Sequence, residues 1–142
     1  MQLTIFSRSH VPKRESAFLN ARVVLCVDDE VFALKLRCLV LLSAGYQVVT
    51  ATEGAAAMEL FGRVHVDLVI TDHSLPGLTG AQLASEIKRL KPAIPVVLFS
   101  GLPEAPPGSE HADLYITKGM PAAEFLRRVG ELIEKMNEYP PA

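Results

Sequence analysis

Side chains that can carry out chemistry stand at the ends of apolar segments along this 142-residue chain. These residues are the adjacent carboxylates Asp28 and Asp29, the carboxylate Asp72, the hydroxyl of Ser100 and the amine of Lys118. A carboxylate at the rim of an apolar segment loses hydration unless a cation or hydrogen-bond donors replace the water. Three carboxylates brought together favour a shared hard divalent cation, and Mg²⁺ is expected because it commonly links carboxylates to phosphate oxygens. The pattern indicates a site that receives a phosphoryl group, whose oxygens the lysine and the hydroxyl could hold.

Each of these residues also has an ordinary structural explanation. Asp28 and Asp29 could cap a helix, Asp72 and Ser100 could belong to turns, and Lys118 could be a solvated surface lysine. The functional interpretation depends on all of them falling at strand ends together. Ligands of open parallel sheets bind beyond the carboxyl ends of the strands, at the point where the strand order reverses.

The elements that must position these residues alternate between strand and helix patterns, which is typical of a parallel sheet covered on both faces. We therefore predict an α/β, flavodoxin-like, doubly wound sheet of five parallel strands in the order 2-1-3-4-5. Capping residues are expected at Asp29, Thr52 and Thr79, and Gly45 is expected to end the first helix. The predicted strands are residues 22–27, 47–51, 67–72, 94–99 and 113–116, and the predicted helices are residues 30–44, 52–63, 79–90 and about 121–136.

Composition bounds the class of protein. Hydrophobic residues make up 49% of the chain and the formal net charge is −2, which predicts a globular protein with no general attraction to nucleic acid or membrane. The apolar stretch at residues 38–42 is too short to cross a bilayer and residues 1–10 lack the apolar core of a signal peptide, so a cytoplasmic protein is expected. Cys26 and Cys38 show no metal or disulfide spacing and are expected to be reduced core thiols. We expect a flexible N-terminal arm at residues 1–20, one domain at residues 21–138, a tail at residues 139–142 and no output domain.

The chain resembles the receiver domain of bacterial two-component response regulators, of the stand-alone single-domain type. The resemblance covers about residues 22–136. Four motifs carry it: VLCVDDE at residues 24–30, DHSLPGLTG at residues 72–80, FSG at residues 99–101 and YITK at residues 115–118.

The resemblance implies a role for each matched residue. Asp72 is expected to be the phosphoacceptor, and Mg²⁺ is expected on Asp28, Asp29, Asp72 and the backbone carbonyl of Ser74. In a phosphorelay, the phosphoryl group comes from a histidine kinase or a histidine phosphotransfer protein. A homodimer is left open.

The same resemblance gives Ser100 and Lys118 the task of sensing the phosphoryl group and Tyr115 that of the switch aromatic. The helix expected at residues 30–44 is apolar nearly all round. Either the N-terminal arm covers its outer face, or that face docks a partner, since receiver domains meet their kinases with this helix.

The chain departs from the family pattern after the fourth strand. Residues 102–112 contain Pro103, Pro106, Pro107 and Gly108, which predicts a fourth helix that is shortened or absent. Gly119 replaces a usual cis proline, and apolar Leu102 stands where a polar group often influences attack by water.

Three other functions remain open from the sequence. A Mg²⁺-dependent phosphohydrolase of the haloacid dehalogenase type also forms an aspartyl phosphate, but it requires Asp-x-Asp rather than an adjacent pair. A flavodoxin-like flavin binder needs a donor-rich phosphate loop, and the residues DDE at 28–30 would repel phosphate. The third is a receiver-like scaffold that no longer switches.

Overall fold

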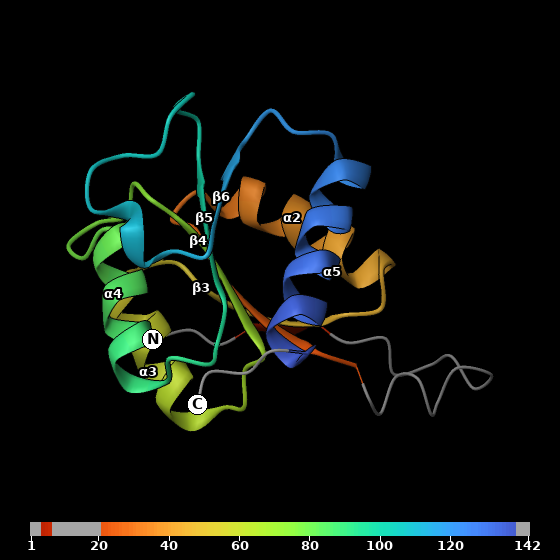
Figure 1. Ribbon diagram of the computed structural model, residues 1–142, viewed down its shortest axis with the longest axis horizontal. Helices are drawn as coiled ribbons and strands as arrows, with labels where there is room; N and C mark the ends of the chain where they lie inside the picture. The colour runs from red at the N-terminus through yellow and green to blue at the C-terminus, as the bar shows by residue number, and fades with distance from the viewer. Residues whose placement is uncertain (1–3, 7–20, 139–142) are drawn as a thin grey trace.

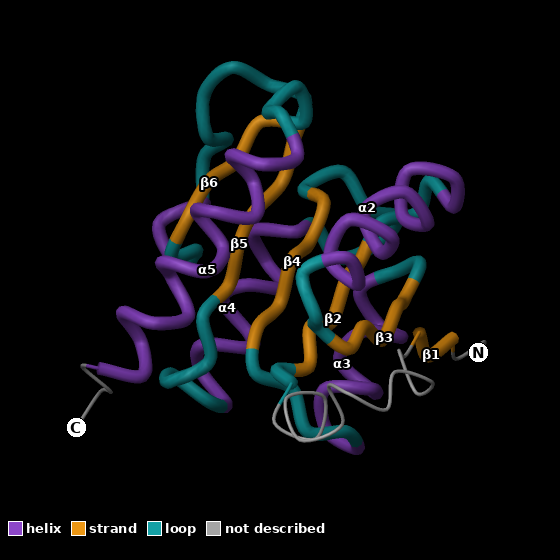
Figure 2. The backbone as a smooth tube through the Cα atoms, turned by 90° about the vertical axis from the view of Figure 1, so that its right-hand side faces the viewer, coloured by secondary structure: helices purple, strands orange, loops and turns teal. Residues whose placement is uncertain are grey.

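The computed structural model describes residues 4–6 and 21–138, which form one twisted sheet with helices on both faces (Figures 1 and 2). The strand order is β1-β3-β2-β4-β5-β6. The five strands from β2 to β6 pair in parallel and have the predicted order 2-1-3-4-5 when counted from β2. The strands are β1 (Thr4–Phe6), β2 (Val23–Val27), β3 (Gln47–Ala51), β4 (Leu68–Asp72), β5 (Val96–Ser100) and β6 (Leu114–Thr117).

Helices α2 (Val31–Ser43) and α5 (Ala122–Glu138) cover one face of this sheet, and α3 (Gly54–Arg63) and α4 (Gly80–Leu90) cover the other (Figure 1). The buried residues form two apolar clusters, one on each face. In β2, Val24 and Cys26 belong to the α2/α5 cluster, whereas Leu25 and Val27 belong to the α3/α4 cluster. Cys26 and Cys38 are buried free thiols, as predicted.

This alternation determines which face of the sheet the side chains of the site residues point toward. Successive side chains of a strand point to opposite faces, so Asp28 continues the row of Cys26 on the α2/α5 face. Leu68 and Ile70 of β4 belong to the same cluster, and Asp72 follows them at the same spacing. The two aspartates therefore project from neighbouring strand ends toward the same side.

Three local predictions were wrong. Part of the expected arm, Thr4–Phe6, is a strand that pairs antiparallel with β3; the rest of the arm and the C-terminal tail lie outside the described residues. The N-cap of α2 is Glu30, not Asp29, because the Glu30 side chain accepts the Ala33 N–H. The N-cap of α3 is Glu53, not Thr52. The Thr79 capping box is confirmed, and Gly45 adopts a φ of 95° after α2.

The fourth helix of the predicted fold is reduced to a single 3-10 turn. Between β5 and β6 the chain runs through bends and turns, and the only helical segment is η2 (Ser109–His111). Gly108 precedes this turn with a φ of 88°, a conformation that favours glycine. No helix in the described part of the chain is long and apolar enough to cross a membrane.

Candidate functional site

Three carboxylates meet beyond the carboxyl ends of β2 and β4. One carboxylate oxygen from each of Asp28, Asp29 and Asp72 lies within 4.8 Å of the others. Asp28 and Asp72 are buried, with 0% and 4% of their surface exposed, and Asp29 is exposed. The three carboxylates that were predicted to converge at the strand ends therefore do lie together.

Lys118 faces this acidic cluster from the end of β6. Its Nζ lies 3.0 Å from Oδ1 of Asp72 and 3.6 Å from Oδ2 of Asp28. The Lys118 backbone N–H donates to the carbonyl of Ser100 at 2.8 Å, which ties the lysine to the end of β5. No cis peptide bond occurs in the described part of the chain, so the bond between Lys118 and Gly119 is trans and Lys118 reaches the site without a cis peptide after it.

Arg37 of α2 is a site residue that the sequence analysis missed. Its Nη1 and Nη2 atoms both donate to Oδ2 of Asp28 at 3.2 Å, and its Cζ lies 4.2 Å from the centroid of the Phe99 ring. Its side chain is only 7% exposed. A signal was present, because Arg37 falls on the helical stripe formed by Leu34, Cys38 and Leu41, all buried. A charged residue inside a core stripe needs a buried partner, and here the partner is an aspartate of the site.

Asp28 already has hydrogen-bond partners on both carboxylate oxygens. Oδ1 accepts the Glu30 N–H at 3.0 Å, while Oδ2 faces the Arg37 guanidinium and the Lys118 ammonium. These contacts explain how a fully buried carboxylate is tolerated, since burial of an ion is costly unless charges and donors compensate.

Asp72 differs from Asp28 in its surroundings. Burial is the main cause that raises the pKa of the Asp72 carboxyl above its ordinary value; the hydrogen bond from Lys118 lowers this pKa, and the nearby charge of Asp28 raises it. The neighbouring His73 carries a buried Nδ1 without a hydrogen-bond partner among the described residues.

The start of α4 packs directly against the backbone that carries Asp72. The Gly80 N–H donates to the His73 carbonyl at 2.8 Å. A Cβ at Gly80 would overlap the carbonyl oxygen of Asp72 and come within 2.7 Å of the His73 Cα. A side chain at this position is therefore excluded unless the Asp72 loop shifts.

The remaining predicted site residues are Ser74 in the loop after β4, Ser100 at the end of β5 and Tyr115 in β6. Ser74 is exposed in the loop between β4 and α4. Ser100 is 4% exposed at the end of β5, and its Oγ accepts the Leu102 N–H at 3.2 Å. The Tyr115 hydroxyl donates to the Leu102 carbonyl at 2.6 Å. Leu102 thus links the hydroxyl proposed to sense phosphate to the proposed switch aromatic.

The donor set suits a hard divalent cation. Carboxylate oxygens are the ligands that Mg²⁺ prefers, and the exposed Asp29 leaves one side of the cluster open to water, which Mg²⁺ usually retains. The cluster lies at the switch point of a doubly wound α/β sheet, where such folds bind ligands. The fold and the site together define a parallel α/β domain with an acidic cluster and an opposing lysine.

Comparison with known proteins identifies the family. The family model described as "Response regulator receiver domain" matches residues 24–129. The chain belongs to the response regulator receiver domain family, as the four sequence motifs predicted.

Curated relatives include the transcriptional regulatory protein GlrR of Escherichia coli K12, 33% identical over 116 residues, which cover 79% of this chain and 26% of GlrR. The sensory transduction protein RegX3 of Mycobacterium tuberculosis is 28% identical over 116 residues, covering 79% of this chain and 51% of RegX3. The chain thus spans between a quarter and a half of the length of these relatives.

Solved structures share the fold. The response regulator protein TrrA from Thermotoga maritima, in complex with Mg²⁺-BeF, aligns with a TM-score of 0.75 and 31% identity, covering 78% of this chain and 98% of TrrA. A CheY-like receiver domain protein from Methanospirillum hungatei aligns with a TM-score of 0.77 over 83% of this chain and 98% of that chain; at 22% identity it supports the fold alone.

Proposed function

We propose that this receiver domain accepts a phosphoryl group on the carboxylate of Asp72 from a phosphohistidine of a histidine kinase or phosphotransfer protein. One observation carries the proposal: Asp72 is buried beside Asp28 and Asp29, and the Nζ of Lys118 lies 3.0 Å from its Oδ1. A nucleophilic carboxylate and a cation that can neutralise incoming phosphate thus occupy one site.

The reaction is an in-line displacement at phosphorus. An oxygen of the Asp72 carboxylate forms the new O–P bond while the N–P bond of the phosphohistidine breaks, and the electron pair stays on the departing imidazole. Lys118 interacts with a phosphoryl oxygen and offsets its charge. When bound, Mg²⁺ would supply further charge neutralisation, held by Asp28, Asp29, Asp72 and the backbone carbonyl of Ser74. The product is a labile acyl phosphate.

Phosphorylation then biases a conformational equilibrium. The phosphoryl group offers Ser100 and Lys118 a better partner than the free carboxylate does, and the loop at Leu102 is bonded to both Ser100 and Tyr115. A movement of Ser100 toward the phosphoryl group therefore pulls on the contact with Tyr115. The single turn η2 leaves a smaller surface for output than a full helix would.

The donor protein docks on α2. The outer face of this helix exposes four large apolar side chains, between 51% and 68% exposed: Val31, Phe32, Leu36 and Leu39. This face borders the acidic cluster, because α2 begins two residues after Asp29. An apolar helix face next to the acceptor suits a helical partner that presents a phosphohistidine. A homodimer through α2 is the alternative occupant, which sedimentation of the isolated domain would detect.

Acetyl phosphate with Mg²⁺ tests the acceptor directly. We expect the wild-type chain to gain one phosphoryl group by intact-mass spectrometry, and the label to be lost with hydroxylamine, as an acyl phosphate requires. Asp72→Asn is expected to abolish labelling, while Glu59→Gln, which neutralises an exposed carboxylate on α3, retains it. Full labelling of a folded Asp72→Asn variant would refute the proposal.

A further inference from the structure

The acidic cluster contains a second cation besides the lysine expected for the family. We propose that Arg37 is a resident counter-cation of the site, which competes with Mg²⁺ for Asp28 and so weakens metal binding in the resting domain. The inference rests on the proposed function, because it concerns the metal that the proposed phosphoryl transfer uses. Arg37 acts here as a positioning residue and does not contact the reacting atoms.

Hydrogen-bond donors already surround the carboxylate of Asp28. Its Oδ2 receives both terminal nitrogens of Arg37 at 3.2 Å and faces the Nζ of Lys118 at 3.6 Å, and its Oδ1 receives the Glu30 N–H at 3.0 Å. A carboxylate offers about four lone-pair positions in total, and these donors use most of them. A cation that takes Asp28 as a direct ligand must therefore displace one of the donors.

Of these donors, Arg37 is the one that a metal ion bound to Asp28 would displace most easily. The Glu30 N–H is held by the backbone at the start of α2, and Lys118 has Asp72 as a second and closer partner. The other described contact of the Arg37 guanidinium is with the ring face of Phe99. Phe99 also lines the pocket beside Arg37, so a guanidinium that turns from Asp28 toward this pocket can keep a cation–π partner, which lowers the cost of its movement.

Arg37 also changes the net charge of the acidic cluster. The three carboxylates contribute −3 if all are ionised, and Arg37 and Lys118 contribute +2, which leaves −1 at the cluster. Without Arg37 the cluster would carry −2. A divalent cation is attracted more strongly to the second arrangement, and little water screens the interaction because Asp28 and Arg37 are both buried.

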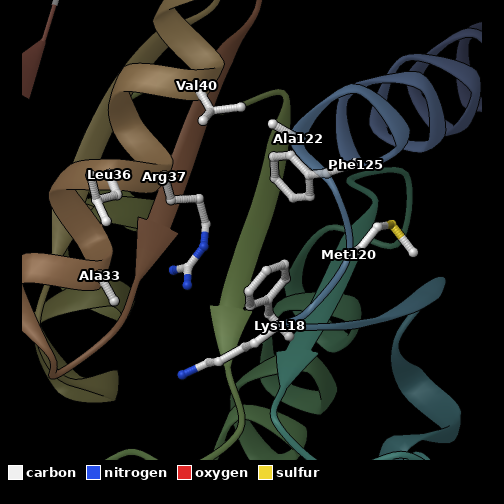
Figure 3. A pocket seen from close by; sticks show the side chains of 9 residues that line it. Ala33, Leu36, Arg37, Val40, Lys118, Met120, Ala122 and Phe125 are labelled. Atoms are coloured by element: carbon white, nitrogen blue, oxygen red, sulfur yellow. The ribbon is translucent and has the colours of Figure 1, made fainter.

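A cavity beside Arg37 gives the displaced side chain room. A pocket of about 260 Å³ lies between α2 and α5 and is lined by Arg37, Lys118, Phe99, Val40, Met120 and Phe125, among others. Figure 3 shows Arg37 and Lys118 reaching toward the same region from opposite sides of this pocket. Arg37 can therefore leave Asp28 without entering the packed core.

Metal affinity of an Arg37→Met variant tests the proposal. Methionine keeps an unbranched apolar stem and removes the charge. We expect calorimetric titration to show Mg²⁺ binding about tenfold tighter in Arg37→Met than in wild type, from the removal of one competing buried charge. Lys35→Met is the matched control, because Lys35 is an exposed cation two positions away on the same helix. Its Mg²⁺ affinity is expected to stay within about twofold of wild type, as for an exposed, screened charge.

A second measurement uses the wild-type chain and does not depend on how well the variant folds. In metal-free protein, the hydrogen bonds to Asp28 should slow rotation of the Arg37 guanidinium, which nuclear magnetic resonance of the arginine side-chain nitrogens reports. Saturating Mg²⁺ should restore fast rotation at Arg37 while leaving Arg127, which pairs with Glu124 and Glu131 on α5, unchanged.

The outcomes separate this inference from the proposed function. Unchanged or weaker Mg²⁺ binding in a folded Arg37→Met variant, or unaltered Arg37 rotation in saturating Mg²⁺, would overturn the inference while phosphoryl labelling of Asp72 still stands. Conversely, tighter Mg²⁺ binding in Arg37→Met together with no labelling of wild-type Asp72 would refute the proposed function and leave the role of Arg37 intact.

Discussion

The Nζ of Lys118 lies 3.0 Å from Oδ1 of Asp72 and 3.6 Å from Oδ2 of Asp28, so a single ammonium group joins the carboxyl ends of β2 and β4. Its side chain is 35% exposed, in contrast to the two aspartates. The lysine therefore stands on the solvent side of the cluster, where an incoming phosphoryl group would meet it. Its backbone bond to Ser100 fixes its distance from the residue proposed to sense that group.

Removal of this ammonium group should slow phosphorylation of Asp72. We expect Lys118→Met to reduce the initial rate of labelling by acetyl phosphate about a hundredfold, the usual scale for loss of one group that stabilises charge in a transition state. Phosphate-affinity gel electrophoresis measures the rate. Lys135→Met, at an exposed position in the last turn of α5, should label at the wild-type rate. Equal rates in both variants would argue against a role for Lys118 in the transfer.

The close approach of α4 to the Asp72 loop makes Gly80 sensitive to a single methyl group. Gly80→Ala should lower the free energy of unfolding by roughly 1–3 kcal/mol, because the new Cβ would overlap the Asp72 carbonyl and the backbone must shift. The shift should also displace Asp72 and slow its labelling. Urea unfolding measures the first effect and acetyl phosphate the second.

Gly62→Ala is the matched control for this substitution. Gly62 lies inside α3, and a Cβ there meets nothing within 4 Å. Alanine in a helix is favoured over glycine by about 0.5–1 kcal/mol, so this variant should be more stable than wild type. Equal effects of the two substitutions would contradict the steric explanation.

The exposed apolar face of α2 should be required for phosphoryl transfer from a histidine kinase but not for phosphorylation by acetyl phosphate. We expect Phe32→Glu and Leu39→Glu each to lower the rate of phosphoryl transfer from a cognate histidine kinase about tenfold, as for loss of a central apolar contact. The rate of labelling by acetyl phosphate should stay unchanged. Leu90→Glu, at another exposed leucine at the end of α4, serves as the control. Loss of both reactions in the α2 variants would instead indicate damage to the fold.

The order of the strands and the meeting of Asp28, Asp29 and Asp72 followed from the sequence because both depend on long-range rules. Alternating strands and helices favour a parallel doubly wound sheet, and such a sheet gathers the residues at its carboxyl ends. The prolines of residues 102–112 likewise allowed the loss of the fourth helix to be predicted, since proline acts locally.

The features that were missed depend on tertiary contacts. Strand β1 has only three residues, which are too few to show the alternation of apolar and polar side chains that marks a strand in a sequence. It is recognised only by its pairing with β3. Asp29 and Thr52 have good capping side chains, but helices α2 and α3 begin one residue later than these caps would require. Arg37 lies on the apolar stripe of α2, but the sequence does not show that its buried partners are Asp28 and Phe99.

The stability of the metal-free domain should respond to pH through Asp72. Burial raises the pKa of this carboxyl in the folded state, so the folded chain keeps its proton to higher pH than the unfolded chain does. The free energy of unfolding therefore falls as pH rises from the ordinary carboxyl pKa through the folded pKa. Asp72→Asn removes this ionisation and should raise the melting temperature in EDTA at pH 7.

The gain from Asp72→Asn should shrink as pH is lowered through the raised folded pKa toward the ordinary carboxyl pKa, below which wild-type Asp72 is neutral in both states. Asp113→Asn provides a control of opposite sign, because its carboxylate accepts the Val96 N–H at 2.7 Å and pairs with Lys88 at 2.6 Å. That variant should melt at a lower temperature than wild type at pH 7. A pH-independent effect of Asp72→Asn would argue against ionisation as the cause.

The hydrogen bond from Tyr115 to Leu102 should restrain the loop that follows Ser100. Tyr115→Phe removes the donor for the Leu102 carbonyl, and we expect a loss of about 0.5–1.5 kcal/mol in the free energy of unfolding. Because the Leu102 N–H is bonded to Ser100, its hydrogen exchange should become faster in the variant. Tyr46→Phe, which removes a hydroxyl near Gly130 of α5, should leave this exchange rate unchanged. Unaltered exchange at Leu102 in Tyr115→Phe would mean that the two residues are not coupled, and that any switching must reach the surface by another route.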